Sequence, residues 1–317
     1  MDWLLVALGL AILLLAGDAL VKGAVNLALR LGIPALIVSL TVVAFGTSAP
    51  ELLVSVQAVL RDVPGIAMGN VVGSNTANIL LVLGVPALLK GLGQADAGSR
   101  HSYIIMLGVS VAFIALCALG PLLWWHGLAL LAMLTFMLGD QVRRARNHRA
   151  AERAAVALDP ADLDGVDPHM PIWRVVLYLA LGLVGLPLGA DMLVDGSVAL
   201  ARNFGVSETV IGLTLVAVGT SAPELATTVM AAFRNKADVA IGNVIGSNIF
   251  NLAGIMGVTA VIAPVPVDRD FLTFDLWVML GASVIIAPFV LRDWALDRAA
   301  GAVLTAGYVA YVAILLI

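Results

Sequence analysis

The sequence predicts an all-α membrane protein with ten transmembrane helices, arranged as two inverted five-helix repeats. Three observations predict this fold class. The chain of 317 residues is 61% hydrophobic and only 12% charged, which is about half the charge of an ordinary soluble domain. Apolar runs long enough to cross a hydrocarbon core of about 30 Å follow one another almost end to end. Finally, two sequence motifs recur at a constant offset of 173 residues, for example from Gly46 to Gly219.

Apolar runs and helix-breaking residues divide the chain into ten predicted spans. The first repeat holds five of them, over residues 3–29, 34–60, 65–89, 102–120 and 124–142. The second repeat holds the other five, over residues 172–201, 207–233, 238–263, 271–291 and 296–316. The long polar segment between the repeats is too short for a further domain and is predicted to be a linker loop. The predicted domains are therefore residues 1–142, 143–171 and 172–317.

Composition and termini exclude several function classes. The net charge is −4 and no basic patch suggests a nucleic-acid partner. Cys117 is the only cysteine, which excludes a disulfide framework and a cysteine-based metal centre. The first residues lack a basic segment and a cleavage signal, so we expect them to remain as the first span.

The repeated motifs indicate an inverted duplication. Residues 46–51 (GTSAPE) recur as 219–224, and residues 69–75 (GNVVGSN) recur as 242–248 (GNVIGSN). From residue 46 to residue 84, 19 of 39 positions are identical to their counterparts without a gap. Because each repeat has an odd number of spans, the second enters the membrane from the opposite side, a common construction of secondary transporters.

The distribution of basic residues predicts the orientation in the cell membrane. A cytoplasmic central loop also places these basic residues in the cytoplasm: Arg30, Lys90, Arg100, Arg234, Lys236, Arg292 and Arg298. Only Arg61, Arg202 and Arg269 fall outside. We therefore expect the central loop to be cytoplasmic and both termini to be outside.

The GTSAPE motif predicts that the second and seventh helices are broken at membrane depth. Pro50 and Pro223 donate no backbone hydrogen bond, and each ring crowds the carbonyl four residues earlier, at Gly46 or Gly219. Broken backbone within a membrane is tolerated where it is buried in protein or lines a cavity. Freed carbonyls beside hydroxyl and carboxylate groups offer hard oxygen ligands, which suit Na⁺, Ca²⁺ and Mg²⁺.

Glu51 and Glu224 are the centre of the predicted cation site. A charged carboxylate at the bilayer centre costs about 2.5 to 3.5 kcal/mol on insertion scales and therefore usually has a function or a partner. No lysine or arginine accompanies either motif, so an exchangeable cation or proton is the natural counter-charge. The alternative is a pair of protonated, hydrogen-bonded glutamic acids that only hold helices together.

Two further polar stripes accompany the glutamates on the third and eighth spans. Spacing of four residues puts each set on one helical face; the two sets are Asn70, Ser74 and Asn78, and Asn243, Ser247 and Asn251. Small residues that permit close helix packing form a neighbouring stripe; they are Gly69 and Gly73, with Gly242 and Gly246 as counterparts. The polar stripes complete a coordination shell or, alternatively, form hydrogen bonds between helices without touching an ion.

The doubled motif, GTSAPE followed by GNVVGSN, resembles the two alpha repeats of the calcium/cation antiporter superfamily, and most closely its prokaryotic sodium/calcium exchanger branch. The resemblance covers essentially the whole chain. It implies a ten-helix fold whose core of eight houses four cation sites, while the long, tilted first and sixth helices slide past that core. It also implies no organic cofactor, since Ca²⁺ and Na⁺ are transported ions.

Carried over residue by residue, the resemblance implies a set of metal ligands at motif positions. These are Glu51, Glu224, Thr47, Thr220, Ser48, Ser221, Ser74, Ser247 and Asn78, with the backbone oxygens of Ala44 and Ala217. Asn251 takes the place of an aspartate that archaeal and potassium-dependent exchangers carry. That substitution removes a possible negative charge, so potassium dependence and the usual stoichiometry do not follow from the resemblance.

The predicted function is secondary antiport of Ca²⁺ and Na⁺ by alternating access, with no enzyme activity and with the lipid bilayer and the transported cations as partners. A complete inverted pair in one chain predicts that a monomer is sufficient. Proton-coupled cation exchange is the nearest alternative, since either glutamate can accept a proton. A cation channel and an intramembrane enzyme with paired carboxylates are further alternatives.

Overall fold

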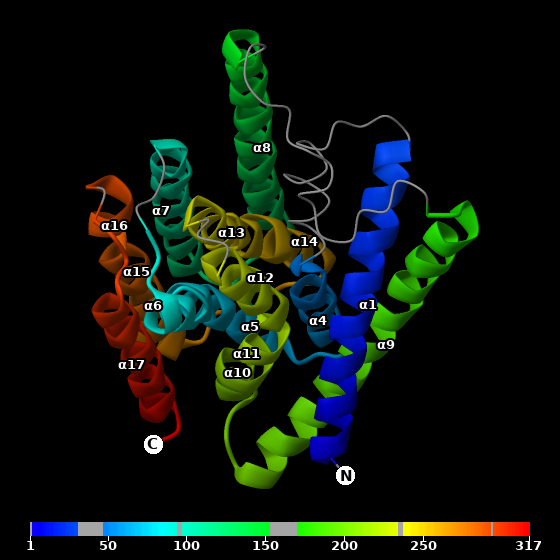
Figure 1. The fold of residues 1–317 in the computed structure, drawn as a ribbon. Helices are drawn as coiled ribbons and strands as arrows, with labels where there is room; N and C mark the ends of the chain where they lie inside the picture. The colour runs from blue at the N-terminus through cyan, green and yellow to red at the C-terminus, as the bar shows by residue number, and fades with distance from the viewer. Residues whose placement is uncertain (1, 31–46, 94–96, 153–169, 234–236, 293) are drawn as a thin grey trace.

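The computed structural model describes residues 2–30, 47–93, 97–152, 170–233, 237–292 and 294–317. Over these residues the protein is a bundle of helices (Figure 1). Seven helices are long and apolar enough to cross a membrane, or eight if a pair bent by 46° counts as one span. The prediction of a multi-span helical membrane protein is confirmed.

The helices of the first half follow the predicted spans closely. They are α1 (Asp2–Arg30), α4 (Ala49–Leu60), α5 (Pro64–Ala77), η2 (Asn78–Val82), α6 (Gly84–Lys90), α7 (Ala97–Ala118) and α8 (Trp124–Glu152). The η segments are π-helical turns, and here α5, η2 and α6 form one continuous span of 27 residues, Pro64–Lys90. Of the second predicted span, residues 34–46 lie outside the described residues, and α4 is the part that the structure describes.

The second half repeats this pattern with its own breaks. It contains α9 (Ile172–Phe204), α10 (Glu208–Ile211), η4 (Gly212–Val216), α11 (Ala217–Thr220), α12 (Ala222–Phe233), α13 (Ala237–Ile249), η5 (Phe250–Ile255), α14 (Met256–Ile262), η6 (Phe271–Asp275), α15 (Leu276–Ile285), α16 (Ala287–Leu291) and α17 (Arg298–Leu315). The bent pair is Glu208–Thr220 followed by Ala222–Phe233.

The structure corrects one predicted boundary. The linker loop was expected to begin at residue 143, but α8 continues as a helix to Glu152. Residues 143–152 (RRARNHRAAE) are rich in arginine and alanine, both of which favour helices. A helix that leaves the apolar layer therefore need not end there, because its polar continuation is stable in water. Residues 153–169 of the predicted loop lie outside the described residues.

Helices α1 and α9 pack side by side along one edge of the bundle (Figure 1). Glycines allow their backbones to approach closely: a Cβ on Gly9 would lie 2.7 Å from the backbone nitrogen of Leu193, and a Cβ on Gly189 would lie 2.9 Å from the carbonyl oxygen of Gly9. No larger side chain fits at these crossings. The two longest apolar helices, one from each half, therefore form a closely packed pair.

Ion pairs engage charged residues on both of these helices. Lys22 binds Asp18 at 2.7 Å, as the spacing of four residues predicts for one helix face. The counterpart of Asp18, Asp191, lacks such a neighbour because Asp195 stands where the first repeat has Lys22. Arg61, which directly follows α4, binds both Asp191 and Asp195 instead. This contact ties α9 to the helices that carry the repeated motifs.

Helix α5 packs between elements of the other half. A Cβ added to Gly69 would lie 2.6 Å from the carbonyl oxygen of Thr209, and one added to Gly73 would lie 2.6 Å from that of Leu213. A side chain at either position would meet the backbone of the opposing helix, which agrees with the packing role predicted for these two glycines. At their counterparts, Gly242 and Gly246, no described atom lies within 4 Å of such a Cβ, so the described residues show no close contact there.

A buried polar contact lies away from the repeated motifs, and we expect it to contribute to the stability of the fold. The Tyr311 hydroxyl of α17 donates to Asp275 at 2.9 Å, and both side chains are buried. A Tyr311→Phe change leaves this carboxyl group without its partner, which costs about 1 to 3 kcal/mol for a buried polar group. We expect a lower melting temperature in a fluorescence-based unfolding assay of the detergent-solubilised protein.

Tyr308 provides the matched control for that change. Its hydroxyl is also buried but has no hydrogen-bond partner in the described structure. Tyr308→Phe therefore removes an unsatisfied polar atom and is expected to leave the melting temperature unchanged or to raise it. Equal losses of stability in the two variants would contradict this account of the Tyr311–Asp275 bond.

Candidate functional site

The GTSAPE motif begins a new helix in both halves. Helix α4 starts at Ala49 with Pro50 in its first turn, and α12 starts at Ala222 with Pro223 in the same position. Proline is tolerated there because the first N–H groups of a helix have no partner within the helix. In the second half, where residues on both sides are described, the helix axis bends by 46° at Ser221.

The two glutamates that follow these prolines are fully enclosed. Glu51 is 1% exposed and Glu224 is 0% exposed. Each accepts a hydrogen bond from the serine of the other repeat: Ser48 Oγ donates to Glu224 Oε1 at 3.2 Å, and Ser221 Oγ donates to Glu51 Oε1 at 3.2 Å. The structure thus brings the motifs of the two halves together in one buried centre.

Each glutamate also presents one oxygen that is not used by the protein. Glu51 Oε2 and Glu224 Oε2 are buried and have no hydrogen-bond partner in the described structure. Buried polar atoms are nearly always satisfied in folded proteins. Two unsatisfied carboxylate oxygens at one centre therefore indicate a place for a proton or a cation.

Asn70 links the two motifs through hydrogen bonds that use its whole amide. Its Nδ2 donates to the backbone oxygen of Glu51 at 3.1 Å and to Ser55 Oγ at 2.9 Å, while its Oδ1 accepts from Thr220 Oγ1 at 3.1 Å. Asn243 repeats one of these contacts, donating to Thr228 Oγ1 at 3.2 Å. These bonds agree with the alternative prediction, in which Asn70 and Asn243 join helices without touching an ion.

Further predicted ligands surround the glutamates. Ser74 Oγ donates to the backbone oxygen of Ala217 at 3.5 Å, and Thr220 Oγ1 lies 3.4 Å from the same oxygen. Ser247 is buried and Thr47 is half-buried. Gly219 packs against the Leu10 side chain of α1, with 2.3 Å between the position of an added Cβ and the nearest Leu10 atom. Ala44 and Gly46 lie outside the described residues.

Four asparagines end or closely follow the second repeated motif, and hydrogen bonds among three of them, Asn75, Asn78 and Asn248, cross from one repeat to the other. Asn78 and Asn251, both predicted ligands, stand at equivalent positions in the first turn of η2 and η5. The other two, Asn75 and Asn248, were not among the predicted site residues, although both end the repeated GNV(V/I)GSN motif. All four are buried. The sequence did contain a signal for the second pair, because an asparagine recurs at the same motif position in both repeats.

The donors at this centre are oxygens and amides only. Within the described residues, no group of three or more histidines, cysteines, aspartates or glutamates is arranged to hold a metal ion. The centre therefore combines two carboxylates with hydroxyl, amide and backbone oxygens, which is the ligand chemistry of hard cations such as Na⁺ and Ca²⁺.

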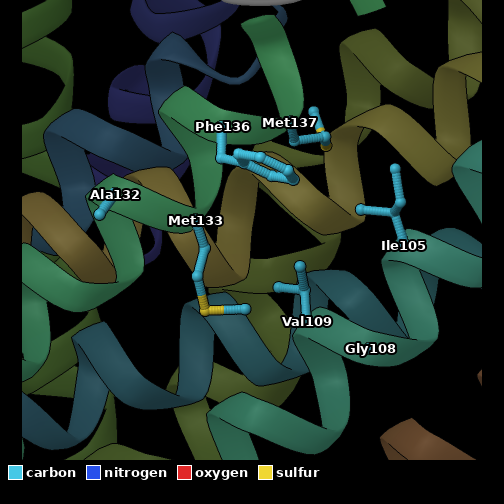
Figure 2. Close-up of a pocket in the computed structure, with 7 residues that line it drawn as sticks. All are labelled: Ile105, Gly108, Val109, Ala132, Met133, Phe136 and Met137. Atoms are coloured by element: carbon cyan, nitrogen blue, oxygen red, sulfur yellow. The ribbon is translucent and has the colours of Figure 1, made fainter. Parts of the chain in front are cut away.

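A pocket elsewhere in the bundle has a different character. It lies between α7 and α8, has a volume of about 510 Å³, and is lined by Ile105, Gly108, Val109, Ala132, Met133, Phe136 and Met137. Figure 2 shows that the drawn side chains carry no oxygen or nitrogen atom. This pocket offers no cation ligand and is separate from the glutamate centre.

Fold and site together define a class: a multi-pass membrane protein with a buried, oxygen-lined centre between two repeated halves, as in cation-exchanging antiporters. The chain belongs to the sodium/calcium exchanger family, because the family model described as "Sodium/calcium exchanger protein" matches residues 1–139 and 174–317. The recognition made from the repeated motifs is thus confirmed.

Individual relatives agree with this assignment. The chain is 35% identical over 309 residues to the putative antiporter CaxA of Alkalimonas amylolytica, covering 96% of each protein. It is 32% identical over 344 aligned positions to the sodium/calcium exchanger MaX1 of Methanosarcina acetivorans, covering 99% of this chain and 98% of the relative. It is also 25% identical over 282 residues to the Ca²⁺/H⁺ antiporter ChaA of Bacillus subtilis, covering 83% of this chain and 78% of the relative.

A solved structure shows the same architecture. The chain is similar to the sodium-calcium exchanger NCX_Mj soaked with 100 mM Na⁺ and 10 mM Sr²⁺, with a TM-score of 0.66 and 29% sequence identity. The match covers 98% of this chain and 97% of the solved chain. The protein is therefore a membrane transporter of a cation-exchanger family.

Proposed function

We propose that this protein exchanges Ca²⁺ for Na⁺ by alternating access, with Glu51 and Glu224 as the central ligands. The observation that supports this most directly is the reciprocal pairing of Ser48 with Glu224 and of Ser221 with Glu51. It leaves one unsatisfied oxygen on each carboxylate. A cation between these oxygens satisfies both groups and both charges.

The proposed ligand set extends from this pair to the surrounding oxygens. It consists of Glu51, Glu224, Thr47, Thr220, Ser48, Ser221, Ser74, Ser247, Asn78, Asn251 and the backbone oxygens of Ala44 and Ala217. Calcium binds six to eight oxygens in proteins, so the set is large enough for one Ca²⁺ or for several Na⁺ ions in turn.

The charge of the two carboxylates explains why transport is coupled. An occupied centre is neutralised by its cations, whereas an empty centre with two buried negative charges must overcome a large desolvation penalty. Only the loaded centre then changes its accessibility at a useful rate, so each movement of Ca²⁺ in one direction must be followed by a return movement with Na⁺ bound. No separate energy source is needed for such exchange.

The proposed architecture comprises ten transmembrane helices in two inverted five-helix repeats, with helices 2 and 7 broken at the ion site. The bend at Ser221 and the restart of α4 at Ala49 support the breaks. Residues 1–142 and 172–317 are the repeats, and residues 143–171 connect them. In the proposed orientation in the cell membrane, the connection is cytoplasmic and both termini are outside. A single chain suffices for transport.

Transport in proteoliposomes tests the proposed function. Vesicles are loaded with Na⁺ and diluted into Na⁺-free medium that contains radioactive Ca²⁺, at equal pH on both sides. We expect Ca²⁺ uptake that requires the outward Na⁺ gradient. Uptake that ignores Na⁺ but follows an imposed pH gradient would establish the alternative, proton-coupled exchange, which ChaA is named for. Uptake with neither gradient would indicate a channel.

Asn251→Asp tests the proposed ligand role of the asparagines. The side-chain nitrogen and oxygen of Asn251 are buried and have no partner in the part of the chain that the structure describes. An aspartate there therefore loses no described hydrogen bond and adds a negative charge. Because ligand charge tunes calcium affinity over orders of magnitude, we expect the half-saturating Ca²⁺ concentration of exchange to fall by about tenfold.

Asn78→Asp is the matched comparison for this change. The amide of Asn78 donates to Asn248 Oδ1 at 3.0 Å, so an aspartate there places two acceptor oxygens against each other. We expect reduced exchange from Asn78→Asp. Identical effects of the two substitutions, or no change in calcium affinity for Asn251→Asp, would argue against the proposed role.

A further inference from the structure

The repeat relates four buried asparagines in two pairs, but their hydrogen bonds are not symmetric. Asn75 corresponds to Asn248, and Asn78 corresponds to Asn251. Asn248 makes two contacts: its Oδ1 accepts from Asn78 Nδ2 at 3.0 Å, and its Nδ2 donates to the backbone oxygen of Asn75 at 3.3 Å. Asn75, its counterpart 173 residues earlier, makes none through its side chain. The side chain of Asn248 thus forms hydrogen bonds through both its oxygen and its nitrogen, whereas the side chain of Asn75 forms none among the described residues.

The atoms that would make the mirrored contacts are the ones left unsatisfied. Exchanging the repeats turns the two observed bonds into Asn251 Nδ2 donating to Asn75 Oδ1, and Asn75 Nδ2 donating to the backbone oxygen of Asn248. All three side-chain atoms of this mirrored set are buried and have no partner among the described residues; they are Asn251 Nδ2, Asn75 Oδ1 and Asn75 Nδ2. Unsatisfied buried amides are costly and uncommon, so their coincidence with the mirrored set requires a reason.

The supporting helices permit both sets of bonds. Helix α13, which carries Asn248, contacts η2, which carries Asn78; likewise α5, which carries Asn75, contacts η5, which carries Asn251. Helix α5 is helical through Asn75, and helix α13 is helical through Asn248. The elements that carry the mirrored partners are therefore already in contact.

Inverted repeats supply the reason. When two halves are related by an axis in the membrane plane, exchanging the conformations of the halves converts a state open to one side into a state open to the other. A contact made only by the second repeat in one state is then made only by the first repeat in the opposite state. The side-chain amides of Asn75 and Asn251, which have no partner among the described residues, are those that form hydrogen bonds in the opposite state.

We propose that Asn75 and Asn248 form a two-state hydrogen-bond switch that alternates with the side to which the cation centre is open. This inference rests on the proposed alternating-access function and assigns positioning roles to two residues outside its ligand set. In the state that the structure describes, Asn248 accepts a hydrogen bond from Asn78, and the side-chain amide of Asn251 is free to face a cation. In the opposite state, Asn75 accepts a hydrogen bond from Asn251, and the side chain of Asn78 no longer bonds to Asn248.

Alanine substitutions at the two positions test the switch because they act in opposite directions. Asn248→Ala removes contacts of the present state, whereas Asn75→Ala removes contacts of the opposite state only. A net hydrogen bond shifts a two-state equilibrium by about fivefold, and each variant loses two such bonds, so the two variants shift it by about 25-fold in opposite directions. The double variant loses both sets and is expected to return close to the wild-type balance.

Hydrogen exchange provides a measurement that does not depend on which ion is carried. Purified protein in ion-free nanodiscs is deuterated, and exchange is compared between peptides of α4 and α12, which extend towards opposite faces in the proposed topology. We expect the α4-to-α12 ratio to change in opposite directions in Asn75→Ala and Asn248→Ala. Changes in the same direction, or an unchanged ratio in both, would overturn the switch.

Two further comparisons separate the switch from a general loss of stability. Ser110→Ala removes a buried hydroxyl that bonds only within α7, to the backbone oxygen of Met106 at 2.9 Å, and should not move the ratio. If an alanine variant does not purify as a monodisperse protein, Asn75→Ser and Asn248→Ser retain a small polar side chain and carry the same expectation. The two proposals can fail separately. Ca²⁺ flux of the wild type that does not depend on Na⁺ would refute the proposed Na⁺ coupling, but it would leave the α4-to-α12 hydrogen-exchange ratio, and so the test of the switch, unaffected.

Discussion

Glu51→Gln and Glu224→Gln should each reduce Na⁺-dependent Ca²⁺ uptake by about 100-fold or more. Glutamine preserves the size of each side chain and still accepts the hydrogen bond from Ser221 or Ser48, so the fold is kept. The substitution removes one of the two buried charges of the proposed cation site. Losing one partner of a buried charge pair costs about 2 to 5 kcal/mol, which is enough to abolish measurable exchange. Initial rates of radioactive Ca²⁺ uptake in Na⁺-loaded proteoliposomes measure the effect.

The matched control is Glu208→Gln, which neutralises a glutamate in the first turn of α10, outside the proposed ligand set. We expect its uptake to stay within about twofold of wild type. Calcium should also raise the melting temperature of wild type and of this control, since a ligand that binds the folded state stabilises it. Near-normal uptake by either Glu51→Gln or Glu224→Gln, with the protein folded, would refute the central role of the pair.

Gly73→Ala should destabilise the protein and impair transport through a single added methyl group. Its Cβ would lie 2.6 Å from the backbone oxygen of Leu213 and 2.8 Å from the Cβ of Ala217. Neither atom moves unless the backbone of the opposing helix moves. Overpacking of this kind typically costs about 1 to 3 kcal/mol. The shift also displaces Ser74 from Ala217, so both the melting temperature and the uptake rate should fall.

Gly108→Ala controls for the general effect of replacing a helical glycine. Gly108 lies in α7, and no described atom lies within 4 Å of an added Cβ there. Alanine favours a helix over glycine by about 1 kcal/mol, so we expect unchanged or slightly increased stability and normal uptake. A Gly73→Ala protein as stable and as active as Gly108→Ala would show that the close packing of α5 is not required.

Much of the fold could be predicted because its causes are local in the sequence. Hydrophobic runs of span length predict transmembrane helices without knowledge of their neighbours. The Asp18–Lys22 pair follows from spacing on one helix face. The extension of α8 to Glu152 was missed because apolarity was used as the boundary signal, whereas helix propensity and not apolarity determines where a helix ends in water.

The partner of Asp191 shows where local reasoning stops. Its own helix offers Asp195 in place of a lysine, so no charge pattern within α9 predicts a salt bridge. Arg61 reaches it from a position 130 residues earlier. Such a pairing depends on how α4 and α9 pack, and hydrophobic periodicity does not encode which helices become neighbours.

The sequence by itself determined that the protein spans a membrane, that its halves are copies, that each copy carries one acidic group directly after a proline, and that it belongs to the exchanger family. Only the tertiary structure decided that each serine binds the glutamate of the other repeat, and that Asn248 is engaged while Asn75 is idle. Repeated motifs are symmetric in sequence, so they specify which residues are equivalent. A folded chain in one conformation breaks that symmetry, and the resulting choice of partners depends on contacts between residues about 170 positions apart.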